Sequence, residues 1–329
     1  MTVTLINPRS TFVERIRLHQ LVGGSRDALV DYREVLGEGI RLVVDTVTRI
    51  DAAECSGGAA AVGRRRRACN GRTDGSRSQS DRRRDSRRAG GGGPHRDPWS
   101  AARCFGPYLH PRGRRSVAKR LEKLGVTVLA GSGATVTAVT RDAVQLSGGR
   151  ELPSEVTIWT AGFGVPDLAD GSGLSTDALG RLLTDETLTS VDDVRVVAAG
   201  DSAAPSNLPL RMSCQAAGPL GAHAADTVLS RIAGEQPAPI NVGFAGQCIS
   251  LGRRAGIFQF ADKDDTAKRL YLGGRPGAKV KEFVCKHTVK QLADEARNPG
   301  SHTWAKDDKR QQLLQAKRGE APATAERAA

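Results

Sequence analysis

The sequence has no long apolar segment and few aromatic residues. No run of about 18 or more apolar residues occurs in the 329 residues, so we expect no membrane-spanning helix. The N-terminal residues lack a basic region followed by a long apolar stretch, so we expect no secretory signal. Aromatic residues make up 4% of the chain, whereas glycine occurs 38 times. This composition favours α/β packing, and the length fits about two domains.

The cysteines and histidines lack the spacing of a metal site. No two cysteines form a C-x-x-C pair, which argues against a zinc ribbon and against a dithiol redox pair. His19, His223 and His287 show no metal-ligand spacing either, so we predict no metal site. Without a secretory signal, the expected state is six free thiols in a reducing cytoplasm. These are Cys55, Cys69, Cys104, Cys214, Cys248 and Cys285.

Residues 63–104 contain no Ile, Leu, Val, Met, Phe or Tyr. Such a segment buries too little apolar surface to offset the entropy of ordering its backbone, so we expect residues 64–102 to be disordered. Sixteen Arg and four Asp between Arg64 and Arg115 give this window most of the net charge of +13. The rest of the chain is close to neutral, and its charge says nothing about function.

Two interpretations of this segment stay open. In the first, it is a flexible arginine-rich arm of a non-enzymatic protein that binds nucleic acid or other polyanions. In the second, it is an out-of-frame translation of a GC-rich gene. When every codon of residues 91–97 is read one base later, the genetic code permits Gly-Gly-Gly-Leu-Thr-Gly-Ile, which contains a G-x-G-x-x-G phosphate loop.

Hydrophobic patterning outside this segment predicts alternating strands and helices. Strands are expected over residues 3–6, 41–50, 126–129, 136–140, 144–146, 155–159, 194–199, 243–260 and 269–272. Residues 12–22 are amphipathic, and helices are expected over residues 117–124, 210–231 and 278–297. The tail from residue 301 is rich in Lys, Gln, Ala and Glu, and we expect it to fray.

The most informative segment for function is residues 195–204. An apolar strand there leads into Gly200 and Asp201, and a small-residue helix follows. In open α/β sheets, ligands bind at the carboxyl ends of strands. Gly lets a ligand approach the backbone, and Asp can accept hydrogen bonds from sugar or ribityl hydroxyls. The alternative is that Asp201 merely caps the following helix.

Two flanking segments strengthen the ligand interpretation. Residues 157–163 predict a strand that runs into a small-residue turn, and residues 213–221 read Ser-Cys-Gln-Ala-Ala-Gly-Pro-Leu-Gly. In this order, the three segments resemble flavoproteins of the pyridine nucleotide-disulfide reductase superfamily, in particular type II NADH dehydrogenases and related FAD-dependent NAD(P)H oxidoreductases. Residues 4–18 resemble the second strand of the FAD domain and the segment after it. The resemblance covers about residues 1–54 and 108–300.

The resemblance implies FAD and NAD(P)H as cofactors. Gly200 and Asp201 are expected at the flavin ribityl chain, and the helix that starts after Ser213 is expected to face the isoalloxazine ring. Hydride passes directly from nicotinamide to flavin, so no catalytic side chain is predicted. The implied cofactor-binding residues are Asn7, Gly162, Gly200, Asp201, Ser213, Gln215 and Ala216.

The implied fold is α/β, with two interleaved Rossmann-like nucleotide-binding domains, both incomplete, and a small C-terminal α+β unit. We expect the first part of the FAD domain in residues 1–54 and its second part in residues 151–235. The other expected segments are the Arg/Gly-rich stretch 55–107, a remnant of the NAD(P)H domain in 108–150, the α+β unit in 236–300 and a disordered tail in 301–329.

Several positions depart from the family pattern. The first strand and its G-x-G-x-x-G loop should precede Val3, and the NAD(P)H loop is missing as the sequence stands, so we expect this chain to bind FAD weakly or not at all. The strand-end position that is usually acidic is Asn7. In the quinone-reducing branch a Gln commonly faces the ring, whereas this chain has Pro219 and Leu220. This departure argues against a quinone acceptor. We predict a small-molecule electron acceptor, with quinone kept as one candidate, and no specific nucleic acid partner.

The helix predicted at residues 279–297 has apolar residues on one side and several lysines on the other. A basic amphipathic helix can lie on a membrane surface, and the resemblance favours this for the C-terminal part of the chain. The alternative is that its apolar face packs on its own domain. We expect a cytoplasmic protein, peripheral at most to the inner face of the membrane, and the sequence does not predict its oligomeric state.

Overall fold

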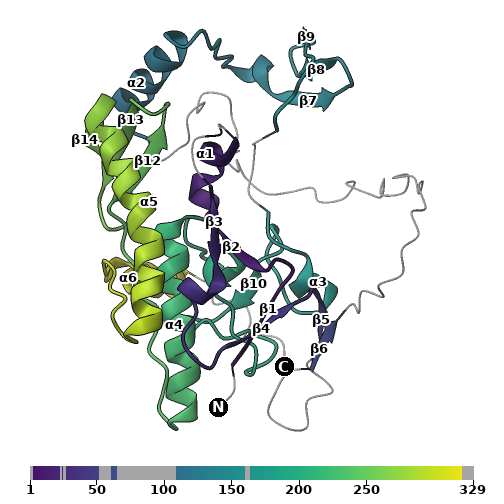
Figure 1. The fold of residues 1–329 in the computed structure, drawn as a ribbon, viewed down its shortest axis with the longest axis vertical. Helices are drawn as coiled ribbons and strands as arrows, with labels where there is room; N and C mark the ends of the chain where they lie inside the picture. The colour runs from purple at the N-terminus through teal and green to yellow at the C-terminus, as the bar shows by residue number, and fades with distance from the viewer. Residues whose placement is uncertain are drawn as a thin grey trace. The chain divides into compact units, whose positions relative to one another are not determined.

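The computed structural model describes residues 3–22, 24, 27–51, 61–64, 109–159 and 164–320. The chain divides into two compact units (Figure 1). The described part of the first unit comprises residues 3–64, 109–127 and 159–320 with the gaps just given, and that of the second comprises residues 128–158. Gly162 and almost all of the arginine-rich segment lie outside the described residues. The predictions of disorder and of a frame error in that segment therefore concern residues that the structure does not describe.

The N-terminal part of the first unit contains three strand pairs. β1 (Thr4–Asn7) pairs in parallel with β4 (Arg41–Val44), so the strand predicted at residues 3–6 is confirmed. β2 pairs with β3 and β5 with β6, both antiparallel. The remaining bounds are β2 (Thr11–Val13), η1 (Arg15–Arg17), α1 (Leu18–Val22), β3 (Leu29–Asp31), η2 (Tyr32–Glu34), β5 (Val47–Asp51) and β6 (Ala61–Arg64).

The strand predicted over residues 41–50 is in fact two strands. The chain leaves β4 at Asp45, whose Oδ1 accepts the Thr46 N–H at 2.7 Å. Because of this break, β4 pairs with β1 while β5 pairs with β6. The amphipathic segment 12–22 contains β2, η1 and α1 instead of one continuous element.

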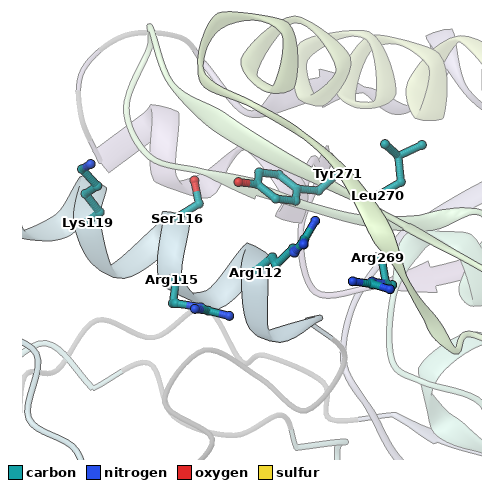
Figure 2. A pocket seen from close by; sticks show the side chains of 7 residues that line it. All are labelled: Arg112, Arg115, Ser116, Lys119, Arg269, Leu270 and Tyr271. Atoms are coloured by element: carbon teal, nitrogen blue, oxygen red, sulfur yellow. The ribbon is translucent and has the colours of Figure 1, made fainter.

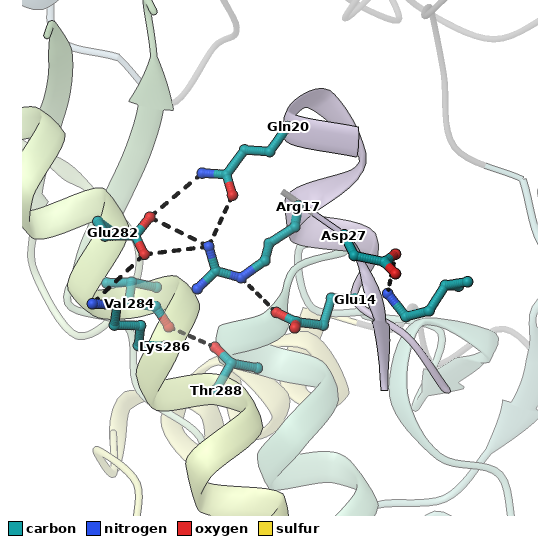
Figure 3. A network of polar contacts seen from close by, with 9 residues as sticks. Glu14, Arg17, Gln20, Asp27, Glu282, Val284, Lys286 and Thr288 are labelled. Atoms are coloured by element: carbon teal, nitrogen blue, oxygen red, sulfur yellow. Dashed lines mark hydrogen bonds and ion pairs between the residues drawn. The ribbon is translucent and has the colours of Figure 1, made fainter. Parts of the chain in front are cut away.

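A buried arginine joins this part of the chain to the long C-terminal helix α5 (Gly274–Arg297) (Figure 3). The Arg17 side chain is 1% exposed, and its Nε donates to Glu14 Oε2 at 2.6 Å. Its Nη1 donates to Gln20 Oε1 at 2.9 Å and to Glu282 Oε2 at 3.3 Å. Burial disfavours the charge of Arg17, but the hydrogen bonds to Glu282 and Glu14 hold its pKa above the ordinary value.

The core of the first unit lies around the parallel pair β10 (Leu182–Thr184) and β11 (Ala203–Pro205). α3 (Leu168–Gly171), η5 (Gly200–Ser202) and α4 (Cys214–Ile232) belong to the same part of the chain, and α4 confirms the helix predicted at residues 210–231. The buried apolar side chains are Leu174, Leu182, Leu188, Val196, Ala198, Ala203, Ala216, Leu220, Ala224, Ile240, Val242 and Phe244.

The sheet strand predicted over residues 194–199 is wrong. The segment makes one isolated bridge, between Thr189 and Val197, and no ladder. Its backbone instead bonds to the preceding turn, where Ala198 N–H donates to Leu188 O at 2.9 Å and Ser190 N–H donates to Val196 O at 2.9 Å. The predicted burial does hold, because Val196 and Ala198 are each 9% exposed.

The C-terminal part of the first unit is an antiparallel sheet under a helix. β12 (Gly246–Ser250), β13 (Gly256–Ala261) and β14 (Ala267–Gly273) pair in this order, and α5 packs against all three. The strands predicted within residues 243–260 and at 269–272 are confirmed, as is the helix at 278–297, which begins earlier. α2 (Pro111–Glu122), predicted at residues 117–124, contacts β13 and β14.

The second unit is a three-stranded antiparallel meander. It consists of β7 (Val136–Val139), β8 (Ala143–Leu146) and β9 (Glu151–Pro153), and η4 (Ser132–Ala134) precedes β7. Gly149 takes a φ of +76° in the turn between β8 and β9. β7 and β8 confirm the strands predicted at residues 136–140 and 144–146.

Two predicted strands, at residues 126–129 and 155–159, do not form. The side chains of Val156 and Ile158 are each 78% exposed, so the second segment is not buried either. A strand forms where a neighbouring strand satisfies its backbone N–H and C=O groups, and no described strand pairs with these two segments. The apolar pattern of the sequence does not reveal whether such a partner exists. Together, the parallel pairs, the helices and the small sheets confirm the α/β fold class and fit the expectation of incomplete domains.

Residues 301–320 differ from the predicted frayed tail. α6 (Lys309–Glu320) follows an extended segment in which Trp304 Nε1 donates to Asn241 O at 2.9 Å. Arg310 is 9% exposed, and it forms a bidentate pair with Glu186 at 2.8 and 2.9 Å. Its guanidinium also donates to Pro205 O at 3.0 Å. The polar composition of this segment predicted disorder. It could not reveal that Arg310 would bond to Glu186 and to the Pro205 carbonyl.

Candidate functional site

The predicted Gly-Asp segment lies where the chain turns from the buried segment before it into η5. Gly200 has a φ of +65°, a left-handed conformation that side-chain-bearing residues rarely adopt. A Cβ on Gly200 would lie 3.6 Å from the Ala217 Cβ, so the turn is packed closely against the first turns of α4. The positive φ explains why glycine occupies this position, because a Cβ at 3.6 Å would make only an ordinary van der Waals contact.

Asp201 connects this turn to the start of α4. Its Oδ1 accepts the Ser213 N–H at 3.2 Å, and no other donor to this carboxylate occurs among the described residues. Burial raises the pKa of Asp201 above its ordinary value, although the Ser213 N–H and the charges of Arg15 and Arg181 favour the ionised form. The carboxylate is thus partly desolvated and has hydrogen-bonding capacity left over.

The N-terminus of α4 lies directly beside this carboxylate. Ser213 is the N-cap residue, but its hydroxyl donates to Arg211 O at 3.2 Å and makes no cap bond to the helix. Ala216 is 1% exposed, and its N–H donates to Ser213 O at 3.0 Å. The backbone N–H groups of Cys214 and Gln215 begin the helix, and this end carries the partial positive charge of the helix dipole.

The Gln215 side chain is bonded to the chain at the start of β12. Its Nε2 donates to Gly246 O at 2.6 Å, and its Oε1 accepts the Ala245 N–H at 3.1 Å. Both ends of the amide therefore tie α4 to the start of β12. The side chain thus positions the helix N-terminus.

Arg211 is a site residue that the sequence did not indicate. Its guanidinium donates to Asp265 Oδ2 at 2.5 Å and to Oδ1 at 3.0 Å, and it lies 5.0 Å from the centre of the Phe244 ring. These contacts hold the chain just before Ser213. Nothing in the sequence could have revealed them, because Arg211 and Asp265 are 54 residues apart.

The remaining predicted positions are not joined to this cluster by any contact among the described residues. Asn7 ends β1, and its Oδ1 accepts the Arg9 N–H at 2.9 Å, so its side chain completes a local turn. Gly162 lies outside the described residues. Pro219 and Leu220 are buried on α4. The described residues contain no cluster of His, Cys, Asp and Glu suited to a metal ion.

The described cysteines are free thiols, as predicted. Cys214 begins α4, Cys248 lies in β12, and Cys285 is fully buried on α5. Burial raises the pKa of Cys248 to about 11. Burial also raises the pKa of Cys285, so both are thiols at neutral pH and poor nucleophiles.

Comparisons with known proteins agree with this arrangement. Residues 100–224 match the family model described as pyridine nucleotide-disulphide oxidoreductase. Two NADH dehydrogenase-like proteins of Mycobacterium tuberculosis are each 28% identical to this chain over 157 residues. Those matches cover 46% of this chain and 38% of each relative, so the chain matches less than two fifths of the length of these curated proteins.

A solved structure shares the fold. The sulfide:quinone oxidoreductase from the hyperthermophilic bacterium Aquifex aeolicus superposes with a TM-score of 0.60. The superposition covers 96% of this chain and 89% of that one, at 13% sequence identity. At this identity the likeness shows the fold alone and carries no information about cofactor or substrate.

Proposed function

We propose that the chain is a member of the pyridine nucleotide-disulphide oxidoreductase family and contains the ribityl-binding side of an FAD site in an NAD(P)H-linked oxidoreductase. The observation that supports the proposal most is the Ser213 N–H···Asp201 hydrogen bond. This bond places a partly desolvated carboxylate beside a helix N-terminus. The first group suits sugar-like hydroxyls, and the second suits the electron-rich end of a reduced flavin.

The residues present fit the flavin at four positions. Gly200 allows a ligand to approach the backbone, and the second oxygen of Asp201 can accept a ribityl hydroxyl. Ser213 is the N-cap of α4 and Ala216 lies in its first turn, where the N–H groups of Cys214 and Gln215 would face the ring. Gln215 contributes by holding that turn against β12. A cofactor-binding role for Asn7 and Gly162 rests on the family resemblance alone, because no contact among the described residues joins them to this cluster.

The chemistry proposed is hydride transfer from NAD(P)H through the flavin to a small-molecule electron acceptor. The chain's own residues bind and orient the cofactor, and no side chain is assigned a proton transfer. The printed sequence contains no G-x-G-x-x-G motif to hold a pyrophosphate, so we expect weak FAD binding and little NAD(P)H oxidation by this chain.

The acceptor is proposed as a small molecule, with quinone as one candidate class. The name of the sulfide:quinone oxidoreductase with the shared fold makes quinone worth testing. Pro219 and Leu220, which stand where a ring-facing Gln was expected, are buried and cannot contact an acceptor.

Contact with a membrane is proposed only for the outer face of α5. The helix packs on the C-terminal sheet, and Phe283 is 65% exposed beside exposed lysines, including Lys279 and Lys286. No helix in the described residues is long and apolar enough to cross a bilayer. Peripheral attachment would therefore depend on Phe283 and these ammonium groups.

An FAD titration tests the proposal. Asp201→Ala should weaken FAD binding by at least about tenfold, because a hydrogen bond to a charged group contributes about 1.5–3 kcal/mol. Asp226→Ala is the matched control, since Asp226 is an exposed carboxylate on α4. Flavin fluorescence quenching in the full chain measures both. Equal FAD affinity in the two variants would contradict the proposal.

A further inference from the structure

A hollow of about 500 Å³ lies between α2 and β14, apart from the proposed flavin site (Figure 2). Cationic side chains dominate its lining. The lining residues are Arg112, Arg115, Ser116, Lys119, Arg269, Leu270 and Tyr271. The hollow is shallow and wide open to solvent, and its cationic lining differs from the enclosed apolar pockets usual for small-molecule sites.

Regular secondary structure fixes the positions of these side chains. The α2 members are spaced three, four and seven residues from Arg112, so they share one face of the helix. Arg269 and Tyr271 are two residues apart on β14 and therefore share one face of the strand. The cationic groups thus come from two rigid elements far apart in the sequence.

Close packing of α2 on the sheet makes the hollow a preformed feature. A Cβ on Gly113 would lie 2.8 Å from Gln259 Oε1, so the helix backbone approaches the sheet very closely. Gln259 is 1% exposed, and its Nε2 donates to Lys268 O at 2.6 Å and to Leu270 O at 3.0 Å. The buried amide thereby holds α2 and β14 in register on either side of the hollow.

The charge of the hollow is uncompensated within the described part of the chain. Arg112, Arg115, Lys119 and Arg269 are exposed, and none of them forms an ion pair with a described carboxylate. The first turn of α2 has no acidic residue, so its arginines oppose the helix dipole. Like charges at these helical spacings also repel one another.

We propose that this hollow binds clustered phosphate groups, either of a soluble oligophosphate or of phospholipid headgroups. A multivalent anion would relieve the repulsion among the cations and the unfavourable position of the arginines at the helix start. Guanidinium groups bind phosphate oxygens in a bidentate geometry, and the hydroxyls of Ser116 and Tyr271 add two donors. A single carboxylate would neutralise one of the four charges, which is why a multivalent anion is favoured.

The test uses the full chain and two probes. Calorimetric titration with inorganic tripolyphosphate examines a soluble ligand, and co-sedimentation with phosphatidylcholine vesicles, with and without phosphatidylglycerol, examines a lipid surface. The double variant Arg112→Gln/Arg269→Gln should lower affinity for the responding probe by about a hundredfold, at about tenfold for each lost charge-assisted contact. Binding should also weaken as salt is raised.

Arg297→Gln is the matched control. Arg297 is exposed at the far end of α5, about 35 Å along the helix axis from Gly274, which follows β14 directly. This substitution should leave binding unchanged. Because the arginine-rich segment is also cationic, only the binding lost in the double variant counts as binding to the hollow. Circular dichroism melting should show that both variants remain folded.

Each outcome decides the proposal. Variant-sensitive binding of tripolyphosphate assigns a soluble oligophosphate, and variant-sensitive binding of the phosphatidylglycerol vesicles alone assigns headgroups. Binding of neither probe would overturn the proposal, as would binding that the double variant leaves intact, and the hollow would then be a solvated cationic face.

Discussion

Asp201 shows how one residue can serve a helix and a ligand at once. Its Oδ1 accepts the Ser213 N–H, which is part of what a simple helix cap would do. Burial, however, raises the pKa of this carboxylate, so its ionised form lowers the stability of the folded chain when no ligand is bound. If Asp201 only capped the helix, its negative charge should stabilise the folded chain. If it binds a ligand, its charge can destabilise the folded chain until the ligand is bound.

The stability of Asp201→Asn separates these two roles. Asn keeps an acceptor for the Ser213 N–H and removes the charge. Because the folded pKa of Asp201 is raised, protonation stabilises the folded chain below the unfolded pKa of about 3.9, and this gain is lost as pH rises through the folded value. We therefore expect the variant to be more stable than the unsubstituted chain at pH 7 without FAD.

Urea unfolding between about pH 4 and pH 7 measures this difference. The gap between the two proteins should shrink as pH falls towards the unfolded pKa. A variant that is less stable at pH 7 would show instead that Asp201 is a structural cap.

At the scale of single residues, the sequence could predict Gly200, Asp201 and Ser213. Gly200 and Asp201 follow a buried apolar segment, and Ser213 precedes a helix, and such positions follow from local patterning. It could not predict what Gln215 and Arg211 contact, because their partners are Gly246 and Asp265, 31 and 54 residues away. Side chains held by tertiary contacts leave no signal in a single sequence.

At the scale of elements, helices and hairpins were predictable and isolated strands were not. The 24-residue α5 and the hairpins of β12–β14 have strong local patterns and satisfy their backbones within a short stretch of chain. The apolar runs at residues 155–159 and 194–199 have the composition of strands, yet each would need a partner strand from elsewhere. Composition shows that a strand could form, and the available neighbours decide whether it does.

The Arg17 network links η1 to α5, and substitutions in it should show how much this link stabilises the fold. Arg17→Met removes the partner of Glu14, whose side chain is 9% exposed, and leaves a buried carboxylate unpaired. We expect a loss of about 3–5 kcal/mol in the free energy of unfolding. Glu282→Gln keeps an acceptor for Arg17 at a site that is 38% exposed, so it should cost less than about 1 kcal/mol.

Chemical denaturation of both variants compares these costs. Similar, small losses in the two variants would show that the pair between η1 and α5 does not stabilise the fold.

At the scale of the whole molecule, the first unit contains two separate chemical environments. One is the half-buried carboxylate and helix N-terminus of the proposed flavin site, which suits a neutral polyol chain and an electron-rich ring. The other is the cationic hollow between α2 and β14, which suits phosphate groups. The similarity to the pyridine nucleotide-disulphide oxidoreductase family suggests a reason for the first environment and none for the second.

Hydrogen–deuterium exchange of the full chain with and without FAD tests the central claim most directly. The account predicts that saturating FAD slows amide exchange in residues 200–202 and 213–217, where the ribityl chain and ring would lie. Exchange in β7–β9 of the second unit should not change. Unchanged exchange at residues 200–202 and 213–217 while FAD is bound elsewhere on the chain would contradict the account.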